Sequence, residues 1–252
     1  MPGMPNPPED HAAPSRPTRV NDYDHLAAGY DSENASSIMN AYYERPAILA
    51  LAGDVAGRRV LDAGCGSGPL FAALRDRGAL VSGIDLSPGM LALAERRLGG
   101  EADLRVADLR DPLPFPDGAF DDVVASLVLH YLRDWGPTLA EFRRVLTTGG
   151  RLIMSVDHPF AVHAVQRAAG QRTDYFATHH WTEEWTMGGL TATMGFWNRP
   201  LHAMTDAFTT AGFRISAISE PLPDPAAREL FPDDFRVLST SPAFLFFVLE
   251  AA

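Results

Sequence analysis

A short apolar run, residues 60–63, leads directly into a turn that has glycine at three alternate positions, Gly64, Gly66 and Gly68. Glycine has no Cβ, so its backbone adopts positive φ and can lie directly against a ligand. Pro69 follows, and proline suits the first position of a helix because its missing N–H would have no partner there. The free N–H groups at such a helix start face whatever sits over the turn. The pattern predicts a nucleotide-type ligand at a strand-to-helix turn.

The details of the turn separate two kinds of nucleotide ligand. A dinucleotide fingerprint has a third small residue three positions after its second glycine, where Pro69 stands in this chain. Asp62, two residues before the first glycine, is not part of that fingerprint. Its carboxylate can pair with an ammonium group, directly or through water. An ordinary glycine-rich turn also produces a bare G-x-G-x-G. The downstream motifs must therefore distinguish a ligand-binding turn from an ordinary one.

Two further acidic residues close the next apolar runs. Asp85 ends the run 79–84, seventeen residues after Gly68, and Asp108 lies at the end of residues 103–109. An acid at the tip of a second strand, about 20 residues past a glycine loop, is placed to accept both hydroxyls of a ribose. The dipeptide Phe120-Asp121 then leads into a long apolar segment, residues 123–132. The order is therefore glycine loop, acid, acid, F-D and apolar strand.

This order resembles the class I S-adenosylmethionine-dependent methyltransferases, in the branch that includes ubiquinone-biosynthesis C-methyltransferases and natural-product methyltransferases. The resemblance covers residues 22–150 strongly and the rest loosely. It implies S-adenosyl-L-methionine as the cofactor, with Asp62 at its ammonium, Asp85 at its ribose and Asp108 beside its adenine. It also implies cofactor contacts from neighbours of these motifs, namely Tyr30, Gly64, Cys65, Gly66, Leu86, Met90, Ala107, Leu109 and Ser126.

The composition excludes several other classes of function. The 252 residues carry a net charge of −11, which disfavours nucleic acid because phosphate binding needs a basic face. All 21 basic residues are Arg, so a Schiff-base lysine, a Walker lysine and a Tyr-x-x-x-Lys dehydrogenase pair are impossible. The single cysteine, Cys65, excludes an internal disulfide and a multi-cysteine metal site, and it suits a small packed residue better than a nucleophile. No apolar run approaches the ~20 residues of a membrane helix. We expect a soluble, cytoplasmic protein without nucleic-acid or membrane partners, and a homo-oligomer is left open.

The elements that must position these residues alternate between strands and helices. We expect strands at 59–62, 80–84, 104–106, 123–127, 151–156, 213–219 and 243–250, with helices between them. Such alternation indicates an α/β fold with a parallel sheet covered on both faces. The resemblance implies a doubly wound, mostly parallel seven-stranded sheet with an N-terminal helical cap over the cofactor.

The chain divides into four expected parts. Residues 1–19, rich in proline, form a disordered tail. Residues 20–156 form the cap helices and the cofactor-binding half of the sheet, and residues 200–252 complete the same domain with a final helix and strand hairpin. Residues 157–199 have no clean period and hold three of the four tryptophans, so we expect an inserted, aromatic-rich substrate lid. An aromatic mini-core that only stabilises the insertion is the alternative.

Two residues are candidates for catalysis. His158 follows the fifth strand, where an imidazole would face the methyl group and could act as a base near neutral pH, although a backbone-bonded hinge histidine is equally compatible. Tyr23 on the cap is the second candidate, as a proton-relay partner or a wall of the cofactor site. His163, His179, His180 and Asp174 lack the i, i+4 spacing of a zinc motif, so we expect no metal.

The function expected from these features is methyl transfer to oxygen, nitrogen or carbon of a small, largely apolar metabolite, aromatic or polycyclic in kind. An apolar, water-poor pocket favours this reaction, because the positive charge of the methyl donor disappears in the transition state. The alternatives are a non-catalytic cofactor-binding or assembly protein on the same fold and, with less support, a nicotinamide-dependent dehydrogenase.

Overall fold

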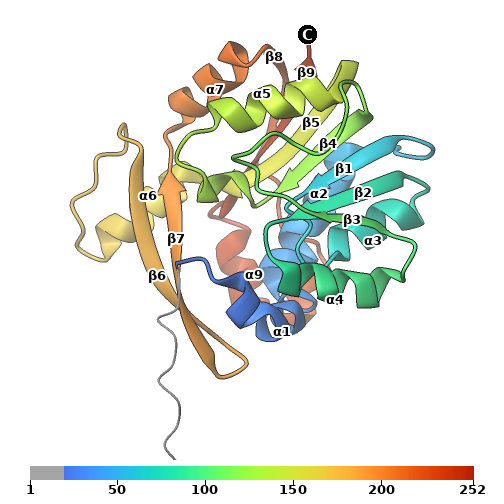
Figure 1. Cartoon of the computed structure of the whole chain (residues 1–252). Coiled ribbons are helices and arrows are strands. Elements are labelled where there is room, and N and C mark those ends of the chain that lie inside the picture. Colours follow the sequence, from blue (N-terminus) through green and yellow to red (C-terminus); the bar gives the residue numbers. More distant parts are fainter. Residues whose placement is uncertain (1–19) are drawn as a thin grey trace, which may run out of the picture.

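The computed structural model describes residues 20–252, so the expected tail, residues 1–19, lies outside the described residues. Strands and helices alternate along most of the chain (Figure 1). The strands are β1 Arg59–Ala63, β2 Leu80–Asp85, β3 Asp103–Val106, β4 Phe120–Ser126, β5 Leu146–Asp157, β6 His179–Met187, β7 Leu190–Asn198, β8 Phe213–Ser219 and β9 Phe244–Ala251. The α-helices are α1 Tyr23–Asn34, α2 Arg45–Ala52, α3 Pro69–Asp76, α4 Pro88–Leu98, α5 Gly136–Val145, α6 Pro159–Ala168, α7 Leu201–Thr210, α8 Ala227–Leu230 and α9 Pro232–Leu238. A π-helix spans Asn40–Glu44 and a 3₁₀-helix spans Leu129–Tyr131.

Seven of the strands form one sheet in the order β3-β2-β1-β4-β5-β9-β8. The pairs from β3 to β5 are parallel, whereas β9 runs antiparallel to both of its neighbours, β5 and β8. The order reverses between β1 and β4, which places the ends of these strands at a topological switch point, where open α/β sheets bind ligands. The predicted seven-stranded, mostly parallel sheet is confirmed.

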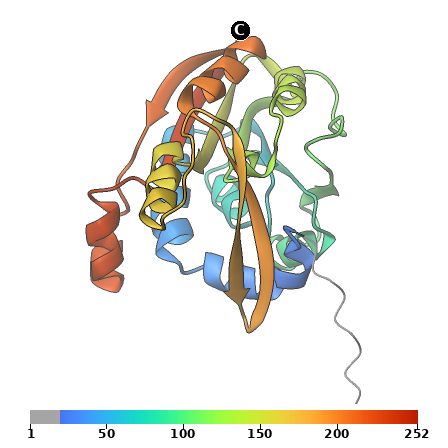
Figure 2. The same ribbon diagram turned by 90° about the vertical axis from the view of Figure 1, so that its left-hand side faces the viewer.

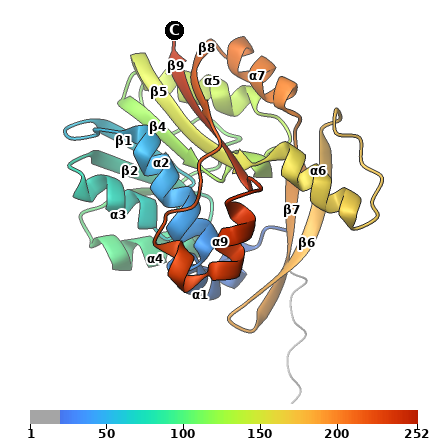
Figure 3. The same ribbon diagram turned by 180° about the vertical axis from the view of Figure 1, so that it is seen from behind.

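Both faces of the sheet are buried, because alternate residues of each strand pack against different helices. On β4, Val123 packs in the cluster that contains Phe142 of α5 and Phe208 of α7. Its neighbour Val124 packs in the opposite cluster, with Leu74 of α3 and residues of α2. Figures 1 and 3 show these helices on the two sides of the sheet. Burial on both faces explains why these strands read as continuous apolar runs in the sequence.

The fifth strand begins earlier than predicted. Gly149 and Gly150, which precede the strand expected at 151–156, lie inside β5, and Leu146 already pairs with Phe120 before the register shifts. Gly149 has a φ of +73°, and a Cβ on Gly150 would lie 3.0 Å from the carbonyl oxygen of Asp121. The two glycines therefore form an irregularity within the β4–β5 pair. In the sequence alone, such a Gly-Gly pair looks like a turn.

The segment before β1 is interrupted at Pro46, as the sequence indicates, but the interruption is a π-helix. Proline has no N–H and cannot bond the carbonyl of the residue four positions earlier, which is Tyr42. That carbonyl accepts instead the backbone N–H of Asp224 at 2.6 Å, from the segment before α8. The wider turn of Asn40–Glu44 thus has its free carbonyl satisfied from outside the helix. Such π-turns occur frequently at functional sites.

The predicted insertion folds as helix α6 followed by the β6–β7 hairpin, which forms a separate two-stranded sheet. Figure 2 shows the hairpin reaching from the main body to α1. Within residues 20–252, no helix is both long enough and apolar enough to cross a bilayer.

Candidate active site

A cavity of about 320 Å³ lies at the carboxyl ends of the strands next to the switch point. Its wall contains the ends of β1, β2 and β4 and parts of α1 and the π-helix. Every residue expected to contact the cofactor lines this cavity, as does Tyr23. These residues are Tyr30, Asp62, Gly64, Cys65, Gly66, Asp85, Leu86, Met90, Ala107, Asp108, Leu109 and Ser126.

The glycine loop needs its glycines for two different reasons. Gly64 has a φ of +79°, and a Cβ there would lie 2.6 Å from Cγ2 of Val128. Gly66 also has a positive φ, of +54°, but a Cβ on it would meet nothing within 4 Å, so its missing side chain leaves open space in the cavity wall. Gly68, in the left-handed conformation, precedes Pro69 at the start of α3. The loop thus leaves room for a ligand beside its backbone.

Asp85 accepts a backbone hydrogen bond from the glycine loop and also lines the cavity. One of its carboxylate oxygens accepts the backbone N–H of Gly66 at 2.9 Å, and the other accepts that of Ser87 at 2.8 Å. Burial raises the pKa of this carboxyl, and the two backbone N–H groups oppose that rise. Each oxygen keeps a free lone pair, so Asp85 can accept hydroxyl donors from a ligand.

Asp62 lies deepest in the site and has no hydrogen-bond partner for either oxygen among residues 20–252. It is 1% exposed, and burial, followed by the nearby charges of Glu44 and Asp85, raises its pKa to about 8. A buried unpartnered carboxyl is costly unless a ligand supplies a donor or a positive charge. The unpartnered carboxyl and the open space beside Gly66 both fit a ligand that carries an ammonium group.

Asp108 lines the cavity near the end of β3, but its carboxylate also binds Arg110. The two side chains form an ion pair at 2.5 Å. This hydrogen bond is the main reason that the pKa of Asp108 lies below its usual value, so the residue remains ionised. Cys65 is buried in the loop, and burial raises the pKa of its thiol, which agrees with a packed residue and not with a thiolate nucleophile.

Helix α1 is fastened over the site by contacts with α4 and with the glycine loop. Asp24 accepts the hydroxyl of Ser87 and the backbone N–H of Gly89, at the start of α4. Asp31 forms an ion pair at 2.8 Å with Arg97, which in turn donates to the carbonyl of Ser67 in the loop. The helix predicted as a cap therefore contacts the loop that it was expected to cover.

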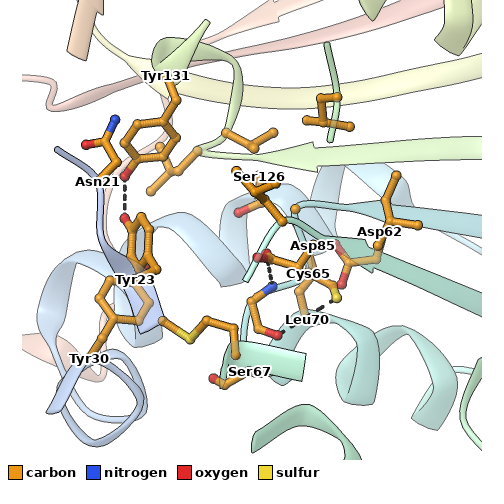
Figure 4. Close-up of a pocket in the computed structure, with 18 of the residues that line it drawn as sticks. Asn21, Tyr23, Tyr30, Asp62, Cys65, Ser67, Leu70, Asp85, Ser126 and Tyr131 are labelled. Carbon is orange, nitrogen blue, oxygen red and sulfur yellow. Dashed lines mark hydrogen bonds between the residues drawn. The ribbon is translucent and has the colours of Figure 1, made fainter. Parts of the chain in front are cut away.

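Two tyrosines meet at the side of the cavity opposite Asp62 (Figure 4). The hydroxyl of Tyr23, on α1, forms a short hydrogen bond with that of Tyr131, from the 3₁₀-helix after β4. The rings of Tyr23 and Tyr30 pack edge to face with centroids 5.1 Å apart. Tyr23 thus lies where the sequence places it, whereas Tyr131 was not singled out.

His158 does not lie where we expected it. Pro159 begins α6, which makes His158 the N-cap residue, and its Nδ1 accepts the backbone N–H of Ala161. Its Nε2 lies 2.7 Å from a carboxylate oxygen of Glu220. The residue does not line the cavity, so the expectation that it faces the reacting methyl group is corrected. An N-cap side chain turns back towards the free N–H groups of its own helix, and this local preference explains the placement.

The aromatic insertion also differs from a pocket-lining lid, because no residue from 157–199 lines the cavity. Its hairpin contributes Phe196, Trp181 and Trp185 to an aromatic cluster that packs against Tyr23 and Tyr131. The insertion thus contains an aromatic mini-core, as in the alternative, but this cluster also packs against tyrosines of the cavity wall. It supports residues of the cavity wall from behind.

One buried residue of the cavity wall, Glu44, was missed entirely. It is 4% exposed at the end of the π-helix, and one carboxylate oxygen accepts the hydroxyls of Ser126 at 2.6 Å and Ser155 at 2.7 Å. Burial raises the pKa of Glu44. Its neighbour Arg45 also lines the cavity and donates to the side chain of Asn34 at 2.7 Å. The only sequence signal for Glu44 is Pro46, which marks the distorted helix.

Comparison with known proteins finds a methyltransferase domain in the chain. Residues 61–154 match the family model described as a methyltransferase domain. An uncharacterised protein of Haemophilus influenzae is 27% identical over 90% of this chain and 94% of its own length. A demethylmenaquinone methyltransferase of Tropheryma whipplei is 34% identical, and the match covers 54% of this chain and 58% of that protein. The chain thus spans a little over half of this curated methyltransferase.

A solved structure extends the likeness over most of the chain. The S-adenosylmethionine-dependent methyltransferase of Mesorhizobium loti is 26% identical, with a TM-score of 0.62, over 81% of this chain and 96% of its own. Together with the domain match and the strand order, this likeness identifies the cofactor as S-adenosylmethionine. Residues 61–154 therefore form a methyltransferase domain, and most of the chain is similar to a solved S-adenosylmethionine-dependent methyltransferase.

Proposed function

We propose that this protein transfers the methyl group of S-adenosylmethionine to a small, largely apolar aromatic or polycyclic metabolite. The observation that carries the proposal is one continuous cavity that joins Asp62, Asp85 and the glycine loop to a wall of apolar and tyrosine side chains. The apolar part of that wall includes Val20, Val128 and Leu132. The named T. whipplei relative acts on demethylmenaquinone, which supports an aromatic type of acceptor.

The charges in the cavity favour an uncharged acceptor. Four acids line it, Glu44, Asp62, Asp85 and Asp108, against two arginines, Arg45 and Arg110, and this excess of acidic groups disfavours an anionic ligand. The whole chain has a net charge of −11, which adds to this repulsion. The proposal therefore excludes acceptors that carry phosphate or several carboxylates near the reacting atom.

Three of the four acids of the cavity have a proposed role towards the cofactor. Asp85, already aligned by Gly66 and Ser87, accepts the ribose hydroxyls, and Asp62 meets the ammonium group. Asp108 lies beside the adenine. When bound, S-adenosylmethionine supplies an electrophilic methyl group on a positively charged sulfur. The remaining task of the protein is to align the acceptor and exclude water, which can lower the barrier by several kcal/mol.

Product formation from methyl-labelled S-adenosylmethionine tests the proposal. The wild-type protein is incubated with a panel of aromatic and polycyclic metabolites that includes naphthoquinols, and products are identified by mass spectrometry. We expect labelled product from the wild type and none from Gly66→Val, because the new side chain fills the open space of the loop. Gly57→Val is the matched control, since Gly57 also has a positive φ, of +72°, and open surroundings, but does not line the cavity.

Calorimetry with S-adenosylmethionine and its demethylated product separates the alternatives. Tight binding of both without transfer to any member of the panel would favour the non-catalytic cofactor-binding protein. Absence of binding would contradict the proposed roles of Asp62 and Asp85.

A further inference from the structure

The two tyrosine hydroxyls at the far side of the cavity form a hydrogen-bonding pair that the cofactor roles leave unused. Tyr23 and Tyr131 come from elements that are distant in the sequence, α1 and the 3₁₀-helix after β4, and their side chains point towards each other (Figure 4). Asp62 and Cys65 lie on the other side of the cavity in the same view. The pair therefore belongs to the part of the cavity that is left for the acceptor.

The pair has one hydroxyl proton to spare. Each tyrosine has a single O–H donor, and one of the two donors is used between the tyrosines. Within residues 20–252, neither hydroxyl makes any other hydrogen bond to the protein. Burial raises the pKa of both Tyr23 and Tyr131 well above the usual value near 10, so both stay protonated near neutral pH. The pair is thus a donor for an oxygen atom and cannot serve as a base.

Aromatic packing holds both rings in place before any ligand arrives. The ring of Tyr131 packs against His130, with centroids 4.5 Å apart, and against Phe196 of the hairpin at 5.4 Å. Tyr23 packs against Tyr30, which stacks on Trp185 of the same hairpin. A donor that is fixed in advance loses little conformational freedom on binding and therefore discriminates well between ligands.

We propose that the Tyr23–Tyr131 pair binds an oxygen of the acceptor, so that the substrate is a phenol, a quinol or a related oxygen-bearing aromatic ring. This inference rests on the proposed function and names the group that the acceptor must carry. The apolar wall contacts the ring, and one hydroxyl donates to the oxygen while the other tyrosine donates to that hydroxyl. Hydrogen bonds in such a chain polarise and strengthen one another. An analogue without the oxygen leaves the buried donor unpaired. The free-energy cost of that unpaired donor makes the site bind the oxygen-bearing ligand in preference to the analogue.

Binding of 2-naphthol and naphthalene tests the inference. Both probes are titrated by fluorescence into the protein saturated with S-adenosylhomocysteine. We expect the wild type to bind 2-naphthol at least about 10-fold more tightly than naphthalene. The double variant Tyr23→Phe/Tyr131→Phe should reduce this ratio to about 1 through weaker binding of 2-naphthol, with the affinity for naphthalene unchanged. Each single variant should lower the ratio less, because the remaining tyrosine keeps its O–H donor. Tyr175→Phe, in the loop between α6 and β6 and outside the cavity, should keep the wild-type ratio.

Two results would overturn the inference: a wild type that does not prefer 2-naphthol, including one that does not bind it, or tyrosine variants that keep the wild-type ratio. The affinity of every variant for S-adenosylhomocysteine is measured in the same series. A wild-type protein that does not bind S-adenosylhomocysteine would refute the proposed function itself. Normal cofactor affinity with an unchanged probe ratio would refute only the role of the tyrosine pair.

Discussion

Asp85 joins the glycine loop to the cavity, and removing its carboxylate should weaken cofactor binding. In Asp85→Ala, the ribose hydroxyls lose a charged acceptor and the backbone N–H of Gly66 loses its partner. Hydrogen bonds to charged groups contribute about 1.5–3 kcal/mol, so we expect the dissociation constant for S-adenosylmethionine to rise about 10- to 150-fold by calorimetry.

The matched control is Asp103→Ala, at the start of the neighbouring strand β3. Asp103 binds Arg105 and Ser82 outside the cavity, so its removal should leave cofactor affinity unchanged. Wild-type affinity in Asp85→Ala would refute the role of Asp85.

Asp62 should make the stability of the ligand-free protein depend on pH. Its pKa is raised from a usual value near 3.8 to about 8, so between these pH values the folded protein holds a proton that the unfolded chain has released. Such a group makes the folded state less stable as pH rises, by up to about 1.4 kcal/mol per pH unit. In denaturant titrations from pH 5 to 9, Asp62→Asn should become progressively more stable than the wild type up to about pH 8, with a constant difference above it.

Asp103→Asn again provides the contrast. The pKa of Asp103 is lowered, chiefly by its hydrogen bond to Arg105, so the stability that it contributes is present at neutral pH and is lost only on acidification. Its difference from the wild type should therefore stay constant between pH 5 and 9. A flat difference for Asp62→Asn over the same range would show that the carboxyl is ionised in the ligand-free protein.

Among the residues of the site, those that belong to contiguous motifs could be predicted from the sequence, whereas those that only the fold brings together could not. Asp62, Gly66 and Asp85 are identified by their spacing along successive strands and turns. Tyr131 carries no local signal and Glu44 has only the nearby Pro46, because the environment of each depends on distant residues: Ser155 for Glu44 and Tyr23 for Tyr131. Residue type and spacing do not encode such contacts.

Among the elements, α1 depends on a close approach to the hairpin. A Cβ on Gly29 would lie 2.7 Å from the backbone of Met187, at the end of β6, and flexible side chains cannot relieve that clash. Gly29→Val should therefore push α1 away from the hairpin and destabilise the protein by about 1–3 kcal/mol. We expect a melting temperature several degrees lower and faster cofactor dissociation in stopped-flow measurements, because α1 also contacts the glycine loop through Arg97.

Gly100→Ala is the control for this variant, since a Cβ at that position meets nothing within 4 Å. It should keep the wild-type melting temperature and dissociation rate. Unchanged cofactor dissociation in Gly29→Val, with the melting temperature lowered, would show that the position of α1 does not govern access to the cavity.

The regular strands and helices of the sheet could be predicted because hydrophobic period, glycine turns and helix-starting prolines all agree there. Helix α4, for example, runs from Pro88 to Leu98, between the strands expected at 80–84 and 104–106. The β6–β7 hairpin could not be predicted, because its aromatic side chains pack against α1 and Tyr131 and give no simple period. For His158, the local capping preference prevailed over the position expected from the family.

For the molecule as a whole, we predict catalysis without metal. Across the part of the chain that the structure describes, no three His, Cys, Asp or Glu side chains are grouped to hold a metal ion. Exhaustive treatment with a chelator should leave both methyl transfer and melting temperature unchanged. Loss of activity that one divalent ion restores would contradict the prediction.

The central position of β9 has a consequence for biosynthesis. Residues 244–251 pair with β5 on one side and with β8 on the other, so β5 keeps an open edge and β8 has no strand partner until β9 has been made. Unpaired strand edges in partly folded chains are sites of aggregation. During translation, β1 to β5 can pair with one another first. β8 can join this sheet only after β9, which lies between β5 and β8, has left the ribosome. The open edge of β5 is therefore covered only after β9 has been synthesised.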